Sequence, residues 1–160
     1  METAPKFIIR LAEPGDLDQL LALEKLFAYD RVSRRSFRRM IDSKTAEIWV
    51  AQSTQGLGML GNFILFTRKG STASRFYSLM IDPTVRRLGV GKALFAAAEA
   101  SVIAQGCTRV TCEVRQDNAP SRAMLARFGY AEGGALPGYY DDGADGIRMV
   151  KDLVNGGRIA

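Results

Sequence analysis

The order of apolar and polar positions in the first half of the chain predicts a strand, two helices and two more strands. Residues 6–12 have the sequence KFIIRLA, a short apolar run that ends at the turn residues 13–16. Asp16 and Ser33 are residue types that cap helices, and leucines recur at a helical spacing after Asp16. The expected segments are strands over residues 6–12, 47–51 and 59–67, and helices over residues 17–26 and 33–41.

Strands and helices alternate in the second half of the chain. A strand ends at Asp82-Pro83, and a glycine-containing turn then begins an alanine-rich helix that runs to Gly106. This order predicts a mixed α/β fold, with a partly parallel sheet covered by helices. The remaining expected segments are strands over residues 75–81, 109–115 and 147–153, and a helix over residues 119–128.

The length and composition of the chain fit one ordinary globular domain. The chain has 160 residues, of which 47% are hydrophobic and 24% charged, and it is long enough to bury a core of its own. We expect one domain over residues 1–154 and a frayed tail over residues 155–160. The first residues lack an apolar run of signal-peptide length, and no segment approaches the ~20 apolar residues that span a bilayer. A cytoplasmic protein that does not contact a membrane is therefore expected.

The rare residue types limit the chemistry that the chain can perform. There is no histidine, which excludes Ser-His-Asp and Cys-His nucleophile pairs and histidine-ligated metals. The two cysteines, Cys107 and Cys112, lack the spacing of a disulfide framework or a zinc site. Acid–base chemistry must use carboxylates, tyrosines, lysines, cysteines or water, and no bound metal is expected.

The positive charge of the chain is concentrated in one segment. The chain has 22 lysine and arginine residues against 17 acidic residues, a net charge of +5. This surplus equals the number of arginines in residues 31–39, a segment without an acidic side chain. Such a segment fits an acidic peptide, a ribosome or another RNA-rich partner, or an anionic protein domain. It also fits a helix face that water solvates, so the partner of residues 31–39 stays open.

The segment Arg86-Arg87-Leu88-Gly89-Val90-Gly91-Lys92 carries the clearest functional signal. A strand ends before it, two glycines permit a tight turn, and the N–H groups that begin the next helix attract phosphate. A GxxxxGK[ST] loop would need Ser or Thr in place of Ala93, and a dinucleotide fingerprint would need glycine in place of Leu94. A tight turn with incidental basic residues is the alternative.

Three groups of residues together resemble the GNAT superfamily of N-acetyltransferases, and most of all its ribosomal-protein alanine N-acetyltransferase type. The segment Arg86–Gly91 is similar to the Arg-x-x-Gly-x-Gly pyrophosphate loop of that superfamily. Residues 112–120 (CEVRQDNAP) with Phe128-Gly129-Tyr130, and the later Tyr139-Tyr140, are similar to stretches of the alanine acetyltransferases. The resemblance implies a GNAT-like fold, with a central mixed sheet of six to seven strands flanked by about four helices.

The resemblance also implies that acetyl-CoA is the acetyl donor. In the superfamily the pantetheine arm lies along the strand before the loop, where backbone groups contact it, and the loop holds the pyrophosphate. Asn118 would either bond the pantetheine arm or cap the helix that follows it. The implied cofactor-binding residues are Leu79, Met80, Ile81, Arg86, Arg87, Leu88, Gly89, Val90, Gly91, Lys92 and Asn118.

Glu113 is the expected general base. In residues 110–115 apolar residues alternate with Thr111, Glu113 and Arg115, so the Glu113 carboxylate lies opposite the apolar face and needs water or a cleft. The resemblance implies that the matching glutamate removes a proton from the acceptor amine. A structural ion pair with Arg115 or Arg109 is the alternative.

The chain departs from the family at the general acid, because Leu125 stands where the family usually has a tyrosine. Tyr139, Tyr140 or water would then protonate the departing thiolate. The two tyrosines would also shape the acceptor pocket, with a role in packing or in a surface turn as the alternative. The resemblance implies the catalytic residues Glu113, Tyr139 and Tyr140, and the substrate-binding residues Tyr29, Arg31, Glu113, Tyr139 and Tyr140.

These residues predict an enzyme that transfers the acetyl group of acetyl-CoA to a primary amine, by direct attack in a ternary complex. Freeing an α-amine of pKa ~8 at pH 7 costs about 1.4 kcal/mol, against about 4.6 kcal/mol for a lysine amine near 10.4. A carboxylate base therefore suits the N-terminus of a protein or peptide. The alternatives are a small-molecule amine (a polyamine, an amino acid or an antibiotic-like amine) and a module that binds acetyl-CoA without turnover.

Overall fold

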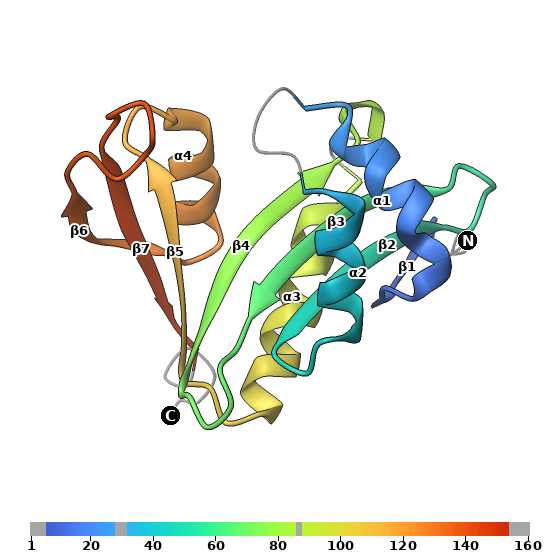
Figure 1. The fold of residues 1–160 in the computed structure, drawn as a ribbon, viewed down its shortest axis with the longest axis horizontal. Coiled ribbons are helices and arrows are strands. Elements are labelled where there is room, and N and C mark those ends of the chain that lie inside the picture. Colours follow the sequence, from blue (N-terminus) through green and yellow to red (C-terminus); the bar gives the residue numbers. More distant parts are fainter. Residues whose placement is uncertain (1–5, 28–31, 86–87, 154–160) are drawn as a thin grey trace, which may run out of the picture. The chain divides into compact units, whose positions relative to one another are not determined.

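The computed structural model describes residues 6–27, 32–85 and 88–153 of the chain. Within this part, seven strands form one mixed sheet in the order β1-β2-β3-β4-β5-β7-β6 (Figure 1). β4 and β5 are parallel, whereas the pairs β1–β2, β2–β3, β5–β7 and β6–β7 are antiparallel. The predicted mixed α/β fold is confirmed.

The helices and strands have the following bounds. The strands are β1 (Phe7–Leu11), β2 (Ala46–Ser53), β3 (Met59–Phe66), β4 (Ala73–Ile81), β5 (Arg109–Arg115), β6 (Ala131–Leu136) and β7 (Gly146–Asp152). The helices are α1 (Leu17–Glu24), α2 (Arg34–Asp42), α3 (Val90–Ala104) and α4 (Ala119–Arg127), with the short 3-10 turns η1 (Pro14–Asp16) and η2 (Pro83–Val85).

The structure adds one strand that the sequence pattern does not predict, and it corrects one helix cap. β6 is exposed over most of its length, contains Gly133-Gly134 and pairs with β7 at an edge of the sheet, so it lacks the alternation that indicates a strand. The predicted cap of α1, Asp16, accepts no capping hydrogen bond and binds Arg10 instead. Ser33 does cap α2, because its hydroxyl accepts the N–H of Ser36 at 3.1 Å.

The chain forms two compact units, and β4 and α3 contribute residues to both. The first unit contains Met1–Phe66 and Ser78–Ala98, and the second contains Thr67–Tyr77 and Glu99–Ala160. The single domain predicted over residues 1–154 stays a prediction. The predicted tail over residues 155–160 lies outside the described part of the chain.

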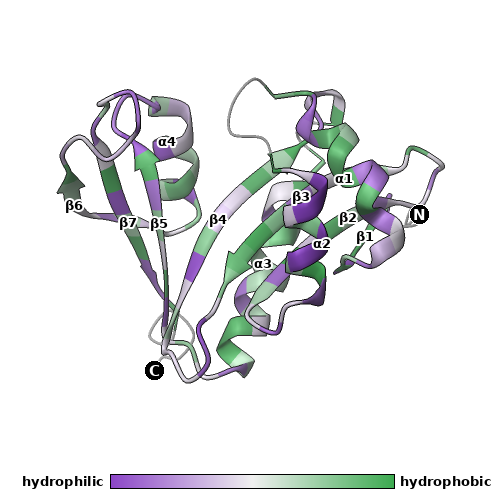
Figure 2. Ribbon diagram, viewed as in Figure 1, coloured by the Kyte–Doolittle hydropathy of each residue, from purple (hydrophilic) through white to green (hydrophobic). Residues whose placement is uncertain are grey.

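In the first unit, β3 is buried by helices on both of its faces. One face joins a core cluster with α1 and α2 that includes Leu20, Phe37 and Ile64, all without exposed surface. On the other face, the ring of Phe63 meets the ring of Phe95 from α3 edge-on, with 4.8 Å between the centroids. Figure 2 shows the resulting hydrophobic character of β3. Burial on both faces explains why this strand has a nearly continuous apolar sequence.

Asn62 is the polar exception in β3. Its side chain is fully buried, and within the described residues neither its amide nitrogen nor its amide oxygen has a hydrogen-bond partner. An unpaired buried amide costs about 1–3 kcal/mol.

In the second unit, a largely buried ion pair joins α3 to β7. Lys151 Nζ lies 2.8 Å from Glu99 Oε1, and the Tyr130 hydroxyl donates to Glu99 Oε2 at 3.4 Å. Burial, and then the negative charge of Glu99, raise the pKa of the Tyr130 hydroxyl above its ordinary value. Tyr130 therefore stays neutral and serves as a packing residue of this unit.

Arg10 and Asp16 form a bidentate ion pair in the first unit. Arg10 Nη1 and Nη2 donate to Asp16 Oδ2 and Oδ1 at 2.8 and 2.9 Å, and the Glu13 N–H donates to Oδ2 at 2.7 Å. The Asp16 side chain is 7% exposed. The hydrogen bond from Arg10, followed by the bond from Glu13, holds the pKa of the Asp16 carboxyl below its ordinary value against the effect of burial.

Asp16→Asn is expected to lower the free energy of unfolding by about 1–3 kcal/mol at neutral pH, because it removes charge-assisted hydrogen bonds. The folded-state pKa of Asp16 lies below its unfolded value of ~3.9. The stabilisation is therefore present above that pH and is lost as the pH falls through the folded-state value. Urea unfolding of both proteins at neutral pH, and at steps between about pH 5 and pH 2, measures the difference.

Asp18→Asn is the matched control for this prediction. Asp18 is exposed and pairs with Arg34 at the surface, so its replacement is expected to change the free energy of unfolding by less than ~0.5 kcal/mol. A difference between Asp16→Asn and the unsubstituted protein that stays constant down to low pH would contradict the role of the Asp16 charge.

Candidate active site

The chain directly after β4 is held by hydrogen bonds of Asp82. Its N–H donates to the Leu60 carbonyl of β3 at 2.9 Å. Its Oδ1 accepts the Thr84 N–H at 2.9 Å and the Thr84 hydroxyl at 2.8 Å. The chain is thus held in place where it leaves β4. The predicted residues Arg86 and Arg87 lie outside the described part of the chain.

Two glycines shape the start of α3. Gly89 has a φ of +83°, a left-handed conformation that favours glycine. A Cβ on Gly91 would lie 3.0 Å from Ile81 Cδ1, so a larger residue would require the end of the Ile81 side chain to shift. The Ala93 N–H donates to the Gly89 carbonyl at 3.0 Å and begins the helical hydrogen bonds. The N–H groups before Ala93 are those that a helix start offers to an anion.

The structure therefore brings the two predicted cofactor-binding segments of the first unit together. Leu79, Met80 and Ile81 at the end of β4 are half-buried, and Met80 packs against the core cluster. Lys92 is exposed in the first turn of α3, which contains no acidic residue. This helix start is suited to a phosphate or pyrophosphate group.

Glu113 lies on the polar face of β5, opposite the buried Cys112, but its side chain is only 8% exposed. Its Oε1 accepts hydrogen bonds from Arg75 Nε at 2.8 Å and lies 2.7 Å from Arg75 Nη2. Its Oε2 lies 3.9 Å from Nε of Arg148. The alternative prediction, that Glu113 forms an ion pair, is thus confirmed. Its predicted partners, Arg115 and Arg109, are wrong, because the partners are Arg75 and Arg148.

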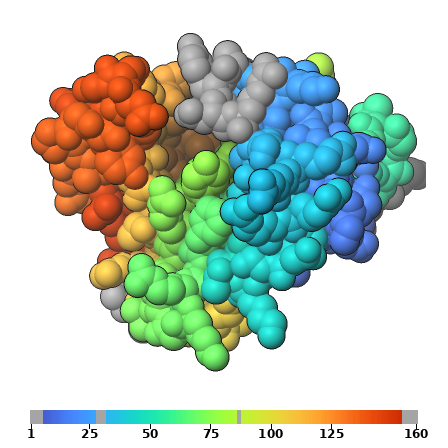
Figure 3. Space-filling model, in the orientation of Figure 1, coloured from blue at the N-terminus to red at the C-terminus, as the bar shows by residue number. Residues whose placement is uncertain are grey.

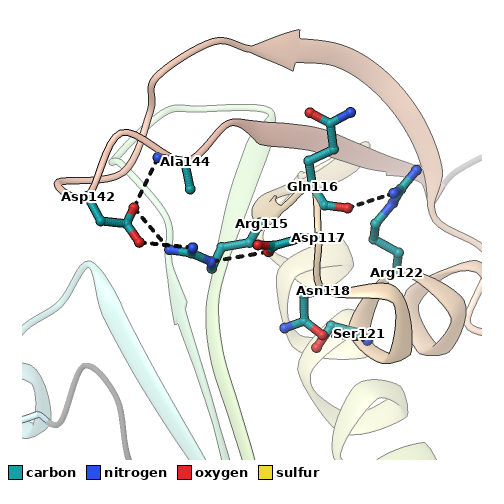
Figure 4. A network of polar contacts seen from close by, with 8 residues as sticks. All are labelled: Arg115, Gln116, Asp117, Asn118, Ser121, Arg122, Asp142 and Ala144. Atoms are coloured by element: carbon teal, nitrogen blue, oxygen red, sulfur yellow. Dashed lines mark hydrogen bonds and ion pairs between the residues drawn. The ribbon is translucent and has the colours of Figure 1, made fainter.

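Arg115 is occupied by two other carboxylates (Figure 4). Its Nη2 lies 2.9 Å from Asp142 Oδ2, and its Nε lies 3.3 Å from Asp117 Oδ1. Asp142 Oδ1 also accepts the Ala144 N–H at 3.0 Å. Asp142 lies in the loop before β7, and Arg115 is the last residue of β5. These bonds therefore hold the loop against the end of β5.

This loop carries the two predicted tyrosines. The rings of Tyr139 and Tyr140 meet edge-on at 5.1 Å, and the Arg115 guanidinium lies 5.2 Å from the centre of the Tyr140 ring. Tyr139 is 45% exposed and lies near Arg75. Against the effect of burial, the hydrogen bond and charge of Glu113 raise the pKa of the Arg75 guanidinium, and Tyr139 adds a smaller contribution. The structure thus brings Tyr139 and Tyr140 to the face of the second unit that holds Glu113.

Asn118 and Leu125 have structural roles in α4. Asn118 Oδ1 accepts the Ser121 N–H at 3.1 Å (Figure 4). This bond confirms the predicted role of Asn118 as the cap of α4. Leu125 is 3% exposed, which makes it a packing residue of the second unit. A bond from Asn118 to the pantetheine arm stays a prediction.

The connection between α1 and α2 is anchored at its ends by a buried carboxylate. Glu24 is 1% exposed, and its Oε1 accepts the N–H of Val32 at 2.7 Å. Tyr29 and Arg31, the predicted acceptor-binding residues of this connection, lie outside the described part of the chain. Their role stays a prediction.

The arginine-rich segment forms α2, which turns one apolar side to the core and the arginines to the surface. Phe37 is fully buried, whereas Arg35, Arg38 and Arg39 are exposed and Arg34 pairs with Asp18. Figure 2 shows the largely hydrophilic α2, and Figure 3 shows its side chains at the outer surface. Its partner stays a prediction.

Sequence reasoning misses Arg75 and Arg148, the two arginines that lie within 4.0 Å of the Glu113 carboxylate. Arg75 is exposed between the buried residues Ser74 and Phe76 of β4, and this alternation predicts that its side chain lies on the polar face of the strand. The parallel pairing of β4 with β5, however, is a tertiary feature. The cross-strand pairing of Glu113 with Arg148 is likewise set by the register of β5 and β7.

A model of the acetyltransferase (GNAT) family matches residues 17–130 of the chain. The chain belongs to this family. The match includes the glycine turn before α3 and the strand of Glu113. The family resemblance of these motifs is confirmed.

Curated relatives of this GNAT chain match it over part of their length. It is 37% identical over 79 residues to an uncharacterised N-acetyltransferase of Methanocaldococcus jannaschii, covering 49% of this chain and 51% of that protein. It is 31% identical over 123 residues to a mycothiol acetyltransferase of Clavibacter michiganensis subsp. michiganensis, covering 73% of this chain and 40% of that protein. The chain thus spans about half the length of the first of these relatives.

The fold also matches a solved GNAT structure. The crystal structure of the ribosomal-protein-S18-alanine N-acetyltransferase from Escherichia coli has a TM-score of 0.78 and 22% identity, and covers 96% of this chain and 99% of that chain. At this identity the match shows the fold alone. It confirms the predicted GNAT-like arrangement of sheet and helices.

Two further properties concern the described residues alone. Residues 6–27, 32–85 and 88–153 contain no group of three or more His, Cys, Asp or Glu side chains that is able to hold a metal ion. None of the helices in those ranges is long and apolar enough to cross a membrane. The cytoplasmic location stays a prediction.

Both cysteines are expected to be unreactive in the folded protein. Cys107 and Cys112 are each 2% exposed, and burial, reinforced by the charge of Glu113, raises the pKa of the Cys112 thiol to about 12. At about pH 8 a thiol reagent should modify neither cysteine until denaturant is added, as counted by mass spectrometry. Rapid modification of Cys112 in the folded protein would contradict this expectation.

Proposed function

We propose that the chain transfers the acetyl group of acetyl-CoA to the α-amine of a protein or peptide N-terminus, by direct attack in a ternary complex. The observation that carries the proposal is the environment of Glu113. Its carboxylate is 8% exposed and lies on the polar face of β5, between the guanidinium groups of Arg75 and Arg148. Membership of the GNAT family supports acetyl transfer as the reaction class.

The start of α3 supports binding of the donor in the first unit. The N–H groups of Val90, Gly91 and Lys92 lie at a helix N-terminus, where they bind anionic groups, and Lys92 adds a positive charge. We assign the pyrophosphate to this helix start. The backbone of Leu79–Ile81 would lie along the pantetheine arm, with one N–H directed at the thioester oxygen, where negative charge develops.

Glu113 is the proposed general base. It accepts a proton from the acceptor ammonium, directly or through water, so that the neutral amine forms the amide C–N bond as the thioester C–S bond breaks. Cys112 is buried and its pKa is raised to about 12. A route through an acetylated cysteine is therefore not part of the proposal.

The departing thiolate receives a proton from Tyr139, from Tyr140 or from water. Leu125 stands where the family usually has a tyrosine, is buried and has no proton to donate. Tyr139 is 45% exposed on the same face of the second unit as Glu113. A thiol of pKa ~8.5 leaves readily enough for water to serve as the acid.

The protonation state of the acceptor favours an α-amine over a lysine side chain. At pH 7 an amine of pKa ~8 is about one-tenth neutral, whereas a lysine amine of pKa ~10.4 is neutral in fewer than about one molecule in a thousand. A single carboxylate with water overcomes the first cost more easily than the second. This difference supports the N-terminus of a peptide as the acceptor.

Glu113→Gln is expected to lower kcat for a peptide acceptor by about 100-fold or more, because the amide accepts no proton from the amine. The release of CoA during the reaction measures the rate, and calorimetric titration with CoA checks that the variant still binds the donor. The matched control is Glu132→Gln, since Glu132 is a carboxylate of the same unit that also pairs with an arginine, Arg122. An unchanged kcat in Glu113→Gln would show that another group is the base.

A second experiment identifies the acceptor amine. Short peptides with a free N-terminus and no lysine are compared with the same peptides carrying a blocked N-terminus and one added lysine. Transfer to the first set alone is expected, because the α-amine is the more easily freed of the two. No transfer to any peptide, by protein that binds CoA in the same preparation, would contradict the proposed acceptor.

A small-molecule amine is the second candidate acceptor. It is favoured by the 31% identity to a mycothiol acetyltransferase over 73% of this chain. Transfer to amino acids, polyamines or thiol-containing amines, without transfer to peptides, would show that the acceptor is a small-molecule amine.

A further inference from the structure

Arg75 holds one oxygen of the Glu113 carboxylate with two of its donors. Its Nε donates to Oε1 at 2.8 Å, and its Nη2 lies 2.7 Å from the same oxygen. Oε2 lies 3.9 Å from Nε of Arg148, which is too long for a hydrogen bond, and it accepts none from the described residues. The two oxygens of Glu113 therefore differ, since one is held and the other is open to a proton.

Strand pairing brings the side chains of Arg75 and Glu113 to one face of the second unit. Arg75 lies opposite Thr111 in the parallel pairing of β4 with β5, and Glu113 is two residues further along β5. Side chains two residues apart in a strand point the same way, so Thr111 and Glu113 share a face. Thr111 is also the last residue of β5 in that pairing. The Arg75 guanidinium thus reaches Glu113 beyond the paired part of the two strands.

The surroundings of Arg75 and Glu113 restrict both side chains. The Arg75 guanidinium lies 5.7 Å from the centre of the Tyr77 ring, within the range of a cation–π contact. Because the Glu113 side chain is 8% exposed, its charge-assisted hydrogen bonds are screened less than those of a surface pair. The carboxylate is therefore held in one orientation from the side of β4.

The orientation of the carboxylate bears on proton transfer at the proposed base. A general base must lie within hydrogen-bond distance of the proton that it accepts, or reach that proton through one water molecule. A misplacement of ~1 Å can cost about 100-fold in rate. With Oε1 engaged by two N–H donors, Oε2 is the oxygen that is left to accept the proton.

We propose that Arg75 is the positioning residue of the proposed base: it binds Oε1 of Glu113 and thereby presents Oε2 to the acceptor ammonium. This inference rests on the proposed acetyl transfer and on Glu113 as its base. The proton passes from the ammonium to Oε2, directly or through water, and the electron pair that it leaves on the amine forms the amide C–N bond as the thioester C–S bond breaks. Arg75 acts through Glu113 and transfers no proton itself.

Two replacements of Arg75 test this role with an N-terminal peptide as acceptor. Arg75→Gln is expected to lower kcat, measured from CoA release, by about 10-fold or more, because Oε1 loses its charged donors and Oε2 its fixed position. The KM for the peptide and the calorimetric affinity for CoA should change by less than about threefold. Arg75→Lys keeps the positive charge and should recover part of the lost kcat.

Arg122→Gln is the matched control. Arg122 also directs its Nε and Nη2 at a single oxygen of a glutamate, Oε2 of Glu132 in the same unit. Glu132 is 49% exposed and is not part of the proposed site. The same kind of ion pair is thus lost at the surface, and kcat should stay within about twofold of that of the unsubstituted protein. Urea unfolding of each variant checks that the protein is folded in the assay.

A double variant separates a positioning role from an independent one. If Arg75 acts through the Glu113 carboxylate, adding Arg75→Gln to Glu113→Gln should lower kcat by less than about twofold, since no base is left to position. A loss in the Glu113→Gln background as large as in the unsubstituted protein would show that Arg75 acts independently of Glu113, and it overturns the inference.

The outcomes distinguish the inference from the proposed function. An unchanged kcat in Arg75→Gln, together with a large loss in Glu113→Gln, overturns the role of Arg75 and leaves the proposed function standing. An unchanged kcat in Glu113→Gln overturns the assignment of the base and the inference that rests on it. A lack of transfer to every peptide, by protein that binds CoA, overturns the proposed function and the inference with it.

Discussion

A carboxylate that is almost fully removed from water requires opposite charge around it, and Glu113 meets this requirement with arginines from the strands on either side. Arg75 comes from the parallel neighbour β4, and Arg148 from the antiparallel neighbour β7. The position of the proposed base therefore depends on β5 lying between these two strands. A different strand order would leave Glu113 a buried charge without partners, which would be strongly destabilising.

The loop before β7 is arranged by the same kind of interaction. Arg115 pairs with Asp117 and Asp142 and lies over the ring of Tyr140. Salt bridges at an exposed position contribute little to stability one by one. Their effect here is to orient Tyr139 and Tyr140 on the face that holds Glu113, the proposed base.

In the first unit, the main constraint is the close approach of the start of α3 to the end of β4. Gly61 of β3 and Gly91 of α3 both leave out a side chain where a Cβ would come within 3.0 Å or less of a neighbouring atom. α3 can therefore begin directly beside the end of β4, with its first N–H groups free of helical partners. The proposed anion binding at this helix start would use backbone N–H groups, so this part of the proposed site would need no particular side chain beyond the glycines.

Much of the fold and of the candidate site could be predicted from local sequence signals. The glycine turn, the alternation around Glu113 and the cap at Ser33 depend on neighbours within a few residues, and the structure places each as predicted. β6 could not be predicted, because an exposed edge strand has no alternating pattern. Arg75, Arg148 and the bond between Asp16 and Arg10 were equally invisible, because each depends on a partner brought close by strand pairing or by a turn.

The sequence by itself determined the family, the glycine turn before α3 and the identity of the proposed base, because these follow from residue types at short, fixed spacings. Only the tertiary structure decided which charges surround that base. Strand order and register bring Arg75 and Arg148 to Glu113 from 38 and 35 residues away along the chain. Over such separations, the sheet pairing alone decides which side chains share a face.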